Sequence, residues 1–197
     1  STETLKPFLL HIFISVALLH DLHLAGVPAS SNSSTGDAAA AADSPLRVGV
    51  SIITGHSSVS NFEATTLPIL AKHRPAAVWL FAPAEDTDPN PHGAIIAAVR
   101  QELDGVRIFV QVGNVAAARE AARDGADVLV CQGVDSGVLL FTLVAVVVSL
   151  VPDVRAMLAA AAAEEEDEEF RGRGVAVLAA GGIADEKGVA AALALGK

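Results

Sequence analysis

The stretch VRIFVQVGNVAAAREAARDGADVLVCQG, residues 106–133, decides the fold class of this chain. It opens with an apolar run at 106–112, continues with an alanine-rich segment at 115–124 and closes with a second apolar run. Asn114 is a favoured N-cap and Gly125 a favoured left-handed residue, so both ends of the predicted helix are marked. Strand, helix and strand in this order predict two parallel strands joined by a crossover helix.

The same alternation extends to both sides of this stretch. Strands are predicted at 47–53, 76–81, 106–112, 126–131 and 175–179. Helices are predicted at 62–73 with a kink at Pro68, 93–103, 115–124, from Pro152 into the acidic run 164–169, and after the cap Asp185 up to Leu195. The chain is therefore predicted to be an α/β protein with parallel strands and outer helices. About five βα units fit either part of an eight-unit (β/α) barrel or an open doubly wound sheet.

The length of the chain predicts one folding unit or part of one, and its composition argues against some classes of partner. The 197 residues are 52% hydrophobic and 18% charged, and the net charge is −10. So acidic a chain repels nucleic acid and anionic lipid, and no nucleic-acid partner is expected. The low-complexity stretch 30–43 divides the chain into an N-terminal segment, 1–45, and a folded domain, 46–197.

Neither a membrane span nor a disulfide is expected. The apolar runs 7–19 and 138–151 are shorter than the roughly 18 residues that a spanning helix needs, and the second run is expected to be buried in a core. Cys131 is the single cysteine, so a cluster of several cysteines around a metal cannot form. A reducing, cytoplasmic compartment is the expectation.

Two loops after predicted strands carry the chemistry. In both fold alternatives ligands bind beyond the carboxyl ends of the strands. The turn at 179–185, AAGGIAD, places two glycines before a helix, which suits either a phosphate site or an ordinary tight turn. The loop at 132–137, QGVDSG, offers an amide, a carboxylate and a hydroxyl that could hydrogen-bond a flavin or nucleotide. No GxGxxG or Walker motif is present.

Several motifs in series resemble those of the nitronate monooxygenase family, formerly called 2-nitropropane dioxygenase. They are 72–81 (KHRPAAVWLF), 109–113 (FVQVG), 125–133 (GADVLVCQG), 149–154 (SLVPDV), 179–185 (AAGGIAD) and 188–196 (GVAAALALG). Their order and approximate spacing agree with that family over residues 46–197.

The resemblance implies an FMN-dependent TIM barrel that oxidises alkyl nitronates with dioxygen and holds no metal. In such enzymes the Gln of the QG loop and a later glycine contact the flavin, and the AGG turn holds its phosphate. Gln132, Gly137, Gly181 and Gly182 are the matching residues here. The implied partners are a small nitronate or nitroalkane and dioxygen, without a membrane, and a homo-oligomer is one assembly open to the chain.

Three departures from the family pattern leave catalysis open. The family's catalytic histidine follows the QG loop, and the matching residue is Leu139, which cannot accept a proton. The family's first strand, with a flavin-contacting Pro-Met segment, is missing before residue 46, and a second phosphate turn is missing after 197. We therefore expect a partial barrel, incomplete at both ends, and assign no catalytic residue.

The other histidines offer one alternative base. His56 directly follows a predicted strand, so it is the histidine expected on the catalytic face. His73 is expected to cap a helix, and His92 is expected to be solvated in a proline-rich loop.

Two other functions stay open. The chain could be a catalytically inactive or truncated remnant of such a barrel. It could also be another FMN- or phosphate-binding barrel, such as a flavin-dependent enoyl reductase or an IMP dehydrogenase-like enzyme, although Cys131 lies inside a strand rather than in a catalytic loop.

Overall fold

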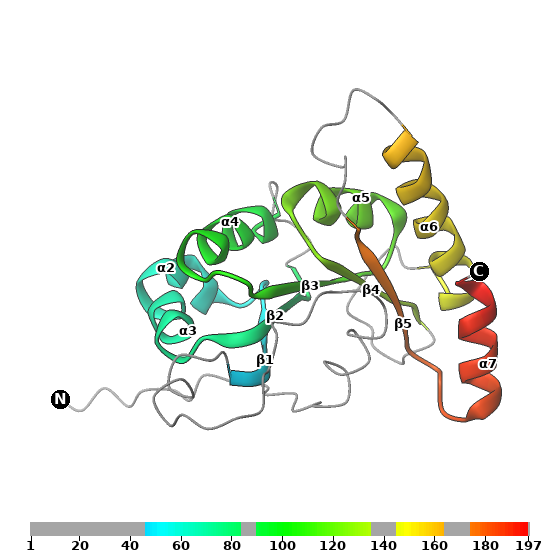
Figure 1. The fold of residues 1–197 in the computed structure, drawn as a ribbon, viewed down its shortest axis with the longest axis horizontal. Helices are drawn as coiled ribbons and strands as arrows, with labels where there is room; N and C mark the ends of the chain where they lie inside the picture. Colours follow the sequence, from blue (N-terminus) through cyan, green and yellow to red (C-terminus); the bar gives the residue numbers. More distant parts are fainter. Residues whose placement is uncertain (1–45, 84–89, 135–144, 164–173, 197) are drawn as a thin grey trace, which may run out of the picture.

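Five parallel strands form one sheet in sequence order. The structure is a computed structural model, and it describes residues 46–83, 90–134, 145–163 and 174–196 (Figure 1). The strands are β1 (Leu46–Ile53), β2 (Pro75–Phe81), β3 (Arg107–Val112), β4 (Val128–Gln132) and β5 (Ala176–Ala180), and each hydrogen-bonds the next. A doubly wound sheet reverses its strand order at a switch point, whereas a barrel wall keeps it. The described sheet is therefore part of a (β/α) barrel.

The helices follow the strands as a crossover pattern requires. They are η2 (Ser57–Asn61), α2 (Phe62–Thr65), α3 (Leu67–His73), α4 (His92–Glu102), α5 (Val115–Asp124), α6 (Val147–Ala163) and α7 (Glu186–Leu195). Asn114 caps α5 by accepting from the Ala117 amide at 2.8 Å, and Gly125 ends that helix with φ +111°. Asp185 caps α7 in the same way. These predicted caps and the five predicted strands are confirmed.

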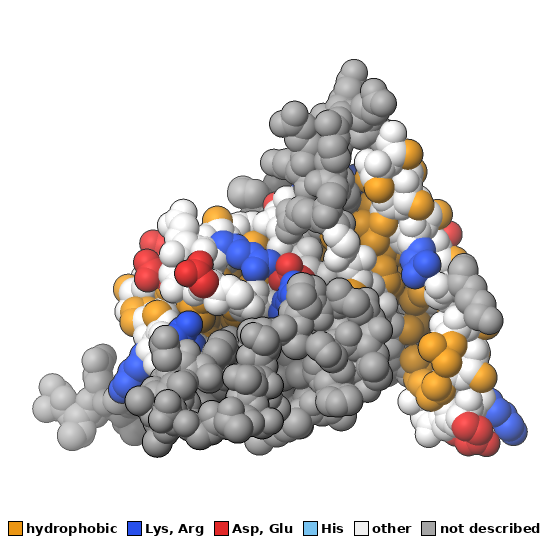
Figure 2. All heavy atoms as spheres, viewed as in Figure 1, with side chains coloured by type: hydrophobic (Ala, Val, Ile, Leu, Met, Phe, Trp, Pro, Cys, Tyr) orange, Lys and Arg blue, Asp and Glu red, His pale blue; other side chains and the backbone are white. Residues whose placement is uncertain are grey.

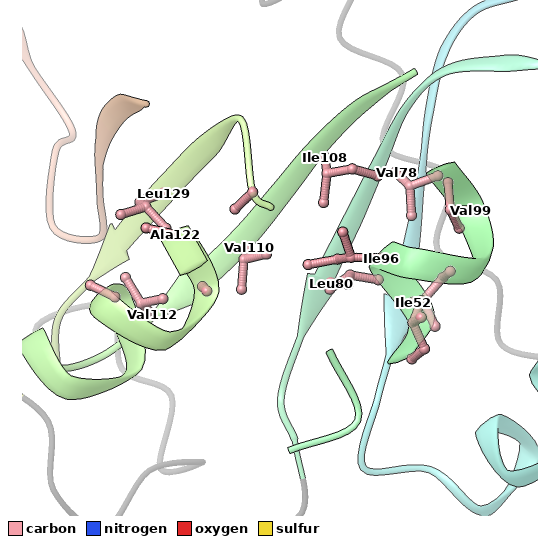
Figure 3. Close-up of a cluster of buried hydrophobic side chains, with 14 of the residues drawn as sticks. Ile52, Val78, Leu80, Ile96, Val99, Ile108, Val110, Val112, Ala122 and Leu129 are labelled. Atoms are coloured by element: carbon pink, nitrogen blue, oxygen red, sulfur yellow. The ribbon is translucent and has the colours of Figure 1, made fainter. Parts of the chain in front are cut away.

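The core lies between the sheet and the helices. Alternate strand residues, among them Val78, Leu80, Ile108 and Val110, point toward α4 and α5 and are completely buried with Val99 (Figure 3). Side chains of consecutive strand residues alternate between faces, so the intervening residues face the other way. This second face, the inner face, carries a smaller cluster of Ala77, Phe109, Val128 and Val130, with Trp79, Ala176, Leu178 and Ala180 packed against it.

A partly exposed ion pair links α4 to the amino ends of the central strands. Arg100 on α4 donates to an Asp127 carboxylate oxygen at 2.6 Å and to the carbonyl of Val106 at 2.7 Å. The same Asp127 oxygen accepts from the Ile108 amide at 2.7 Å. This cluster ties α4 to β3 and β4 at the edge opposite to the one where barrel ligands bind, so its role is structural.

The helix predicted at 62–73 is interrupted. Pro68 has no amide hydrogen and cannot continue the hydrogen-bond ladder of a preceding helix, so α2 ends at Thr65 and α3 starts at Leu67. This is the break expected from the sequence, and His73 ends α3 as predicted.

The helix predicted to begin near Pro152 begins earlier, and that prediction was wrong. α6 starts at Val147, so Pro152 lies inside it. Val147, Leu150 and Val151 are buried, and their burial favours helix ahead of the proline. The acidic run 164–169 and the part of the run 138–151 before residue 145 lie outside the described residues.

The last βα unit is the least covered part of the described sheet. No residue of α7 is buried, and Val189 and Leu193 are 49% and 67% exposed. β5 is half-buried along its whole length. Figure 2 shows hydrophobic side chains at the surface where α6 and α7 lie. No helix among the described residues is long and apolar enough to cross a membrane.

Candidate functional site

The carboxyl ends of all five strands meet at one edge of the sheet. The strands are parallel and paired in register, so the residues that follow them gather there. These are Thr54, Ala82, Gly113, Gly133 and Gly181. We call this the carboxyl edge, and the first residues of the two sequence-predicted loops, at Gln132 and Gly181, lie on it.

The glycine turn after β5 has the backbone shape that only glycine adopts without strain. Gly181 and Gly182 have φ values of +95° and +69°. Within the part of the chain that the structure describes, neither amide donates to a backbone carbonyl. The Asp185 carboxylate already accepts from the Gly188 amide at 2.9 Å, so it occupies the first turn of α7. The two glycine amides are the donors that this turn offers to an anion.

Gln132 lies directly beside this turn. It is the last residue of β4, and its Cα is paired with that of Ala180, the residue before Gly181. Ala180 belongs to the inner-face cluster, so Gln132 is half-buried on that face. The structure thus brings together three of the four residues predicted to bind the cofactor. The fourth, Gly137, lies outside the described residues, as does Leu139.

Both ends of the segment that carries Gly137 and Leu139 are held at the carboxyl edge. The Ala145 amide donates to the Gly113 carbonyl at 3.1 Å, and the Val134 amide donates to the Ala145 carbonyl at 3.3 Å. The segment therefore leaves and rejoins the described fold between the ends of β3 and β4.

A second carboxamide on the inner face was missed by the sequence reasoning. Gln111 on β3 is paired with Val130, two residues before Gln132, so the two glutamines lie on neighbouring strands and the same face. Phe81 ends β2 on that face as well. The signal was available in the strand pattern, since a half-buried glutamine interrupts the apolar run 106–112 at an inner position.

His92 is buried, and the prediction of a solvated loop histidine was wrong. It is the first residue of α4 and only 3% exposed. The Thr54 hydroxyl donates to the Phe81 carbonyl at 3.1 Å, so it accepts from His92 Nε2 at 2.8 Å. Burial lowers the pKa of His92 to about 4, and the imidazole is neutral near pH 7. Thr54 follows Ile52 by two residues, and Ile52 faces the helices. The Thr54–His92 pair therefore lies on the helix side of the carboxyl edge and does not line the inner face.

The strained backbone of the edge lies next to this pair. Ala82 has φ +50°, a conformation that is uncommon for residues other than glycine. The Gly55 amide donates to its carbonyl at 2.8 Å, and the Thr54 amide donates to that of Phe81 at 2.9 Å. His56, the predicted alternative base, follows at the same edge and is exposed.

Cys131 takes no part in the site. It lies in β4, completely buried in the helix-side core, and burial raises the pKa of its thiol to about 12. It is therefore an unreactive thiol. Among the described residues no three His, Cys, Asp or Glu side chains cluster to hold a metal ion.

The family model for nitronate monooxygenase matches residues 4–197. The chain belongs to the nitronate monooxygenase family. The match includes the residues that gather at the carboxyl edge, and it begins within the segment 1–45. The division of the chain at residue 45 stays a prediction.

Two curated relatives and one solved structure are similar to this member of the nitronate monooxygenase family. A nitronate monooxygenase of Neurospora crassa is 43% identical over 155 residues, which are 76% of this chain and 39% of that protein. One from Metarhizium robertsii is 35% identical over 160 residues, 80% of this chain and 40% of that protein. The chain thus spans about two-fifths of the length of these relatives. The structure of FabK from Thermotoga maritima is 25% identical with a TM-score of 0.53, over 78% of this chain and 39% of that one.

Proposed function

We propose that this protein binds FMN and uses it to oxidise alkyl nitronates with dioxygen. The observation that carries the proposal is the meeting of Gln132 with the Gly181–Gly182 turn at one point of the carboxyl edge. A carboxamide and a pair of glycine amides that donate to no described backbone carbonyl can bind the ring and the phosphate of one cofactor. Membership of the nitronate monooxygenase family supports this reading of the pair.

The phosphate end of the proposed cofactor fits the glycine turn. A phosphate is held best by amide hydrogens that converge on it without intervening side chains. Gly181 and Gly182 offer two such amides in left-handed conformations, and a side chain at either position would strain the turn. Because Asp185 caps α7, the glycine amides rather than the first turn of α7 carry the phosphate in this proposal.

The ring end fits the inner face next to the turn. Gln132 and Gln111 each carry one acceptor and two donor hydrogens, which suits a ring edge that presents both carbonyl and N–H groups. Phe109, Val128 and Val130 make the neighbouring strands of that face apolar. When bound, FMN supplies the electron acceptor for the oxidation of the nitronate, and dioxygen completes it.

The residue at position 139 sets the expected substrate form. A neutral nitroalkane must lose a carbon-bound proton before oxidation, and Leu139 cannot accept it. A nitronate is already the anion, so its oxidation needs no base at this position. The protein is therefore proposed to act on nitronates rather than on neutral nitroalkanes.

The test is oxygen consumption by the FMN-loaded protein with propyl-1-nitronate and with 1-nitropropane. We expect turnover of the nitronate and a rate at least about 10²-fold lower with the nitroalkane, the usual size of a lost general base. Leu139→His should raise the nitroalkane rate and leave the nitronate rate within a few-fold. Gln132→Leu should lower both rates.

Leu139 also favours a second candidate, a remnant that binds FMN without turnover. The same assay separates the two. FMN-loaded protein that consumes no oxygen with the nitronate, and gains nothing from Leu139→His, is such a remnant, and the oxidase proposal is then wrong.

A further inference from the structure

The indole nitrogen of Trp79 is buried, and no described residue accepts a hydrogen bond from it. Among the described residues it is the buried side-chain nitrogen or oxygen atom for which no hydrogen bond is found. Nearly all buried polar atoms in folded proteins have a partner, and leaving one unpaired destabilises the folded state. An unpaired donor therefore points to an acceptor that none of the described residues supplies.

The position of Trp79 links this donor to the proposed site. Trp79 is paired with Ser51 on β1 and with Phe109 on β3, and Phe109 belongs to the inner-face cluster. Phe81, the last inner residue of β2, lies two residues further on, a rise of about 7 Å toward the carboxyl edge. Trp79 thus lies one inner-face position below Phe81, on the face that carries Gln111 and Gln132.

The indole is held in place by its neighbour. The rings of Trp79 and Phe109 are stacked, with centroids 6.0 Å apart and an interplanar angle of 20°. Such a contact fixes a ring beyond what its buried area alone does. A fixed neutral donor loses little entropy when it binds an acceptor, so it suits recognition better than a long flexible side chain does.

We propose that Trp79 is a specificity-determining residue whose indole N–H donates a hydrogen bond to an oxygen of the substrate's nitronate group. This rests on the proposed function. The nitronate shares one negative charge between two oxygens, and a hydrogen bond to a charged acceptor is stronger than one between neutral groups. On the described inner face, Arg107 is the cation, and it lies at the amino end, 3.9 Å from Asp127. Neutral donors on the inner face therefore recognise the anion in this proposal.

The test uses butyrate, an unreactive carboxylate with the shape of propyl-1-nitronate, on the FMN-loaded protein. Trp79→Phe keeps an aromatic ring on Phe109 and removes the donor. We expect the variant to bind FMN as the wild type does, while the Kd for butyrate and the KM for propyl-1-nitronate rise about tenfold with kcat within a few-fold. The Kd is read from the change that butyrate causes in the flavin absorbance.

A second measurement needs no variant. Trp79 is the single tryptophan and the chain has no tyrosine, so intrinsic emission reports on this residue. We expect butyrate to change that emission with a saturating dependence on its concentration. A response that is absent, or linear as for free tryptophan in solution, would overturn the assignment.

The outcomes separate this inference from the function on which it rests. FMN binding with equal butyrate affinity in wild type and Trp79→Phe overturns the role of Trp79 and leaves the flavin proposal intact. Failure of the wild type to bind FMN overturns the proposed function, and the role of Trp79 with it.

Discussion

At the scale of single residues, the polar groups at the carboxyl edge fall into two sets. Gln132 lies on the inner face, whereas Thr54 and His92 lie on the helix side and hydrogen-bond each other. Gln132 and the glycine turn were predicted because each stands in a recognisable motif directly after a strand. His92 was mispredicted, because its burial depends on Thr54, which is 38 residues away in sequence. Gln111 and Trp79, to which we assign roles only as proposals, were not singled out, because their position beside Gln132 and Phe109 depends on the register between strands.

The buried His92 predicts an acid-sensitive contribution to stability. The unfolded chain binds a proton at this imidazole below its ordinary pKa of 6.5, whereas the folded protein resists protonation until about pH 4. The contribution of the neutral His92 to the free energy of unfolding is therefore fully present above pH 6.5. It falls by about 3 kcal/mol as the pH is lowered to 4.

Urea denaturation across this pH range checks the prediction. His92→Gln keeps a polar side chain that does not titrate, so it should show a smaller loss of unfolding free energy between pH 6.5 and 4 than the wild type does. Equal losses in both proteins would mean that His92 is not the group responsible.

At the scale of elements, the alternation of short apolar runs with capped helices predicted the order of the described strands and most of their helices. Each strand is within two residues of its predicted bounds, since apolar runs between glycines and polar caps leave few alternatives. The exception is α6, where the start depends on tertiary packing. A proline normally marks a first turn, but the buried residues ahead of Pro152 extend the helix through it.

Pro152 should therefore reduce the stability of α6. An interior proline lacks the amide hydrogen and crowds the preceding turn, so Pro152→Ala should raise the free energy of unfolding by about 1–3 kcal/mol. Pro68 is the matched control, because it stands at the start of α3, where proline is tolerated. Pro68→Ala should change stability by no more than about 1 kcal/mol. Thermal and urea unfolding of both variants measure this, and an equal effect of the two substitutions would contradict the interior placement of Pro152.

At the scale of the whole molecule, the sheet in sequence order, the helices on one face and the glycine turn at the carboxyl edge describe part of a barrel wall. The chain spans about two-fifths of the length of its curated relatives. Sequence patterns left the barrel and the doubly wound sheet as alternatives, because both repeat the same βα unit and differ only in the spatial order of strands. The homo-oligomer that the sequence left open and the expected cytoplasmic compartment are not tested by the structure.

The central claim, that the carboxyl edge binds FMN through the glycine turn, is tested most directly by titrating the protein with FMN and following the flavin absorbance. Gly181→Ala puts a side chain at φ +95°, and Gly105→Ala does so at φ +73°, in an open turn at the amino end of β3. Both carry similar backbone strain, but only Gly181 belongs to the proposed phosphate site. We predict saturable binding to the wild type and to Gly105→Ala, and at least about tenfold weaker binding to Gly181→Ala. The account would be contradicted if the wild type showed no change in flavin absorbance, or if the Gly181→Ala variant bound FMN as tightly as the Gly105→Ala variant does.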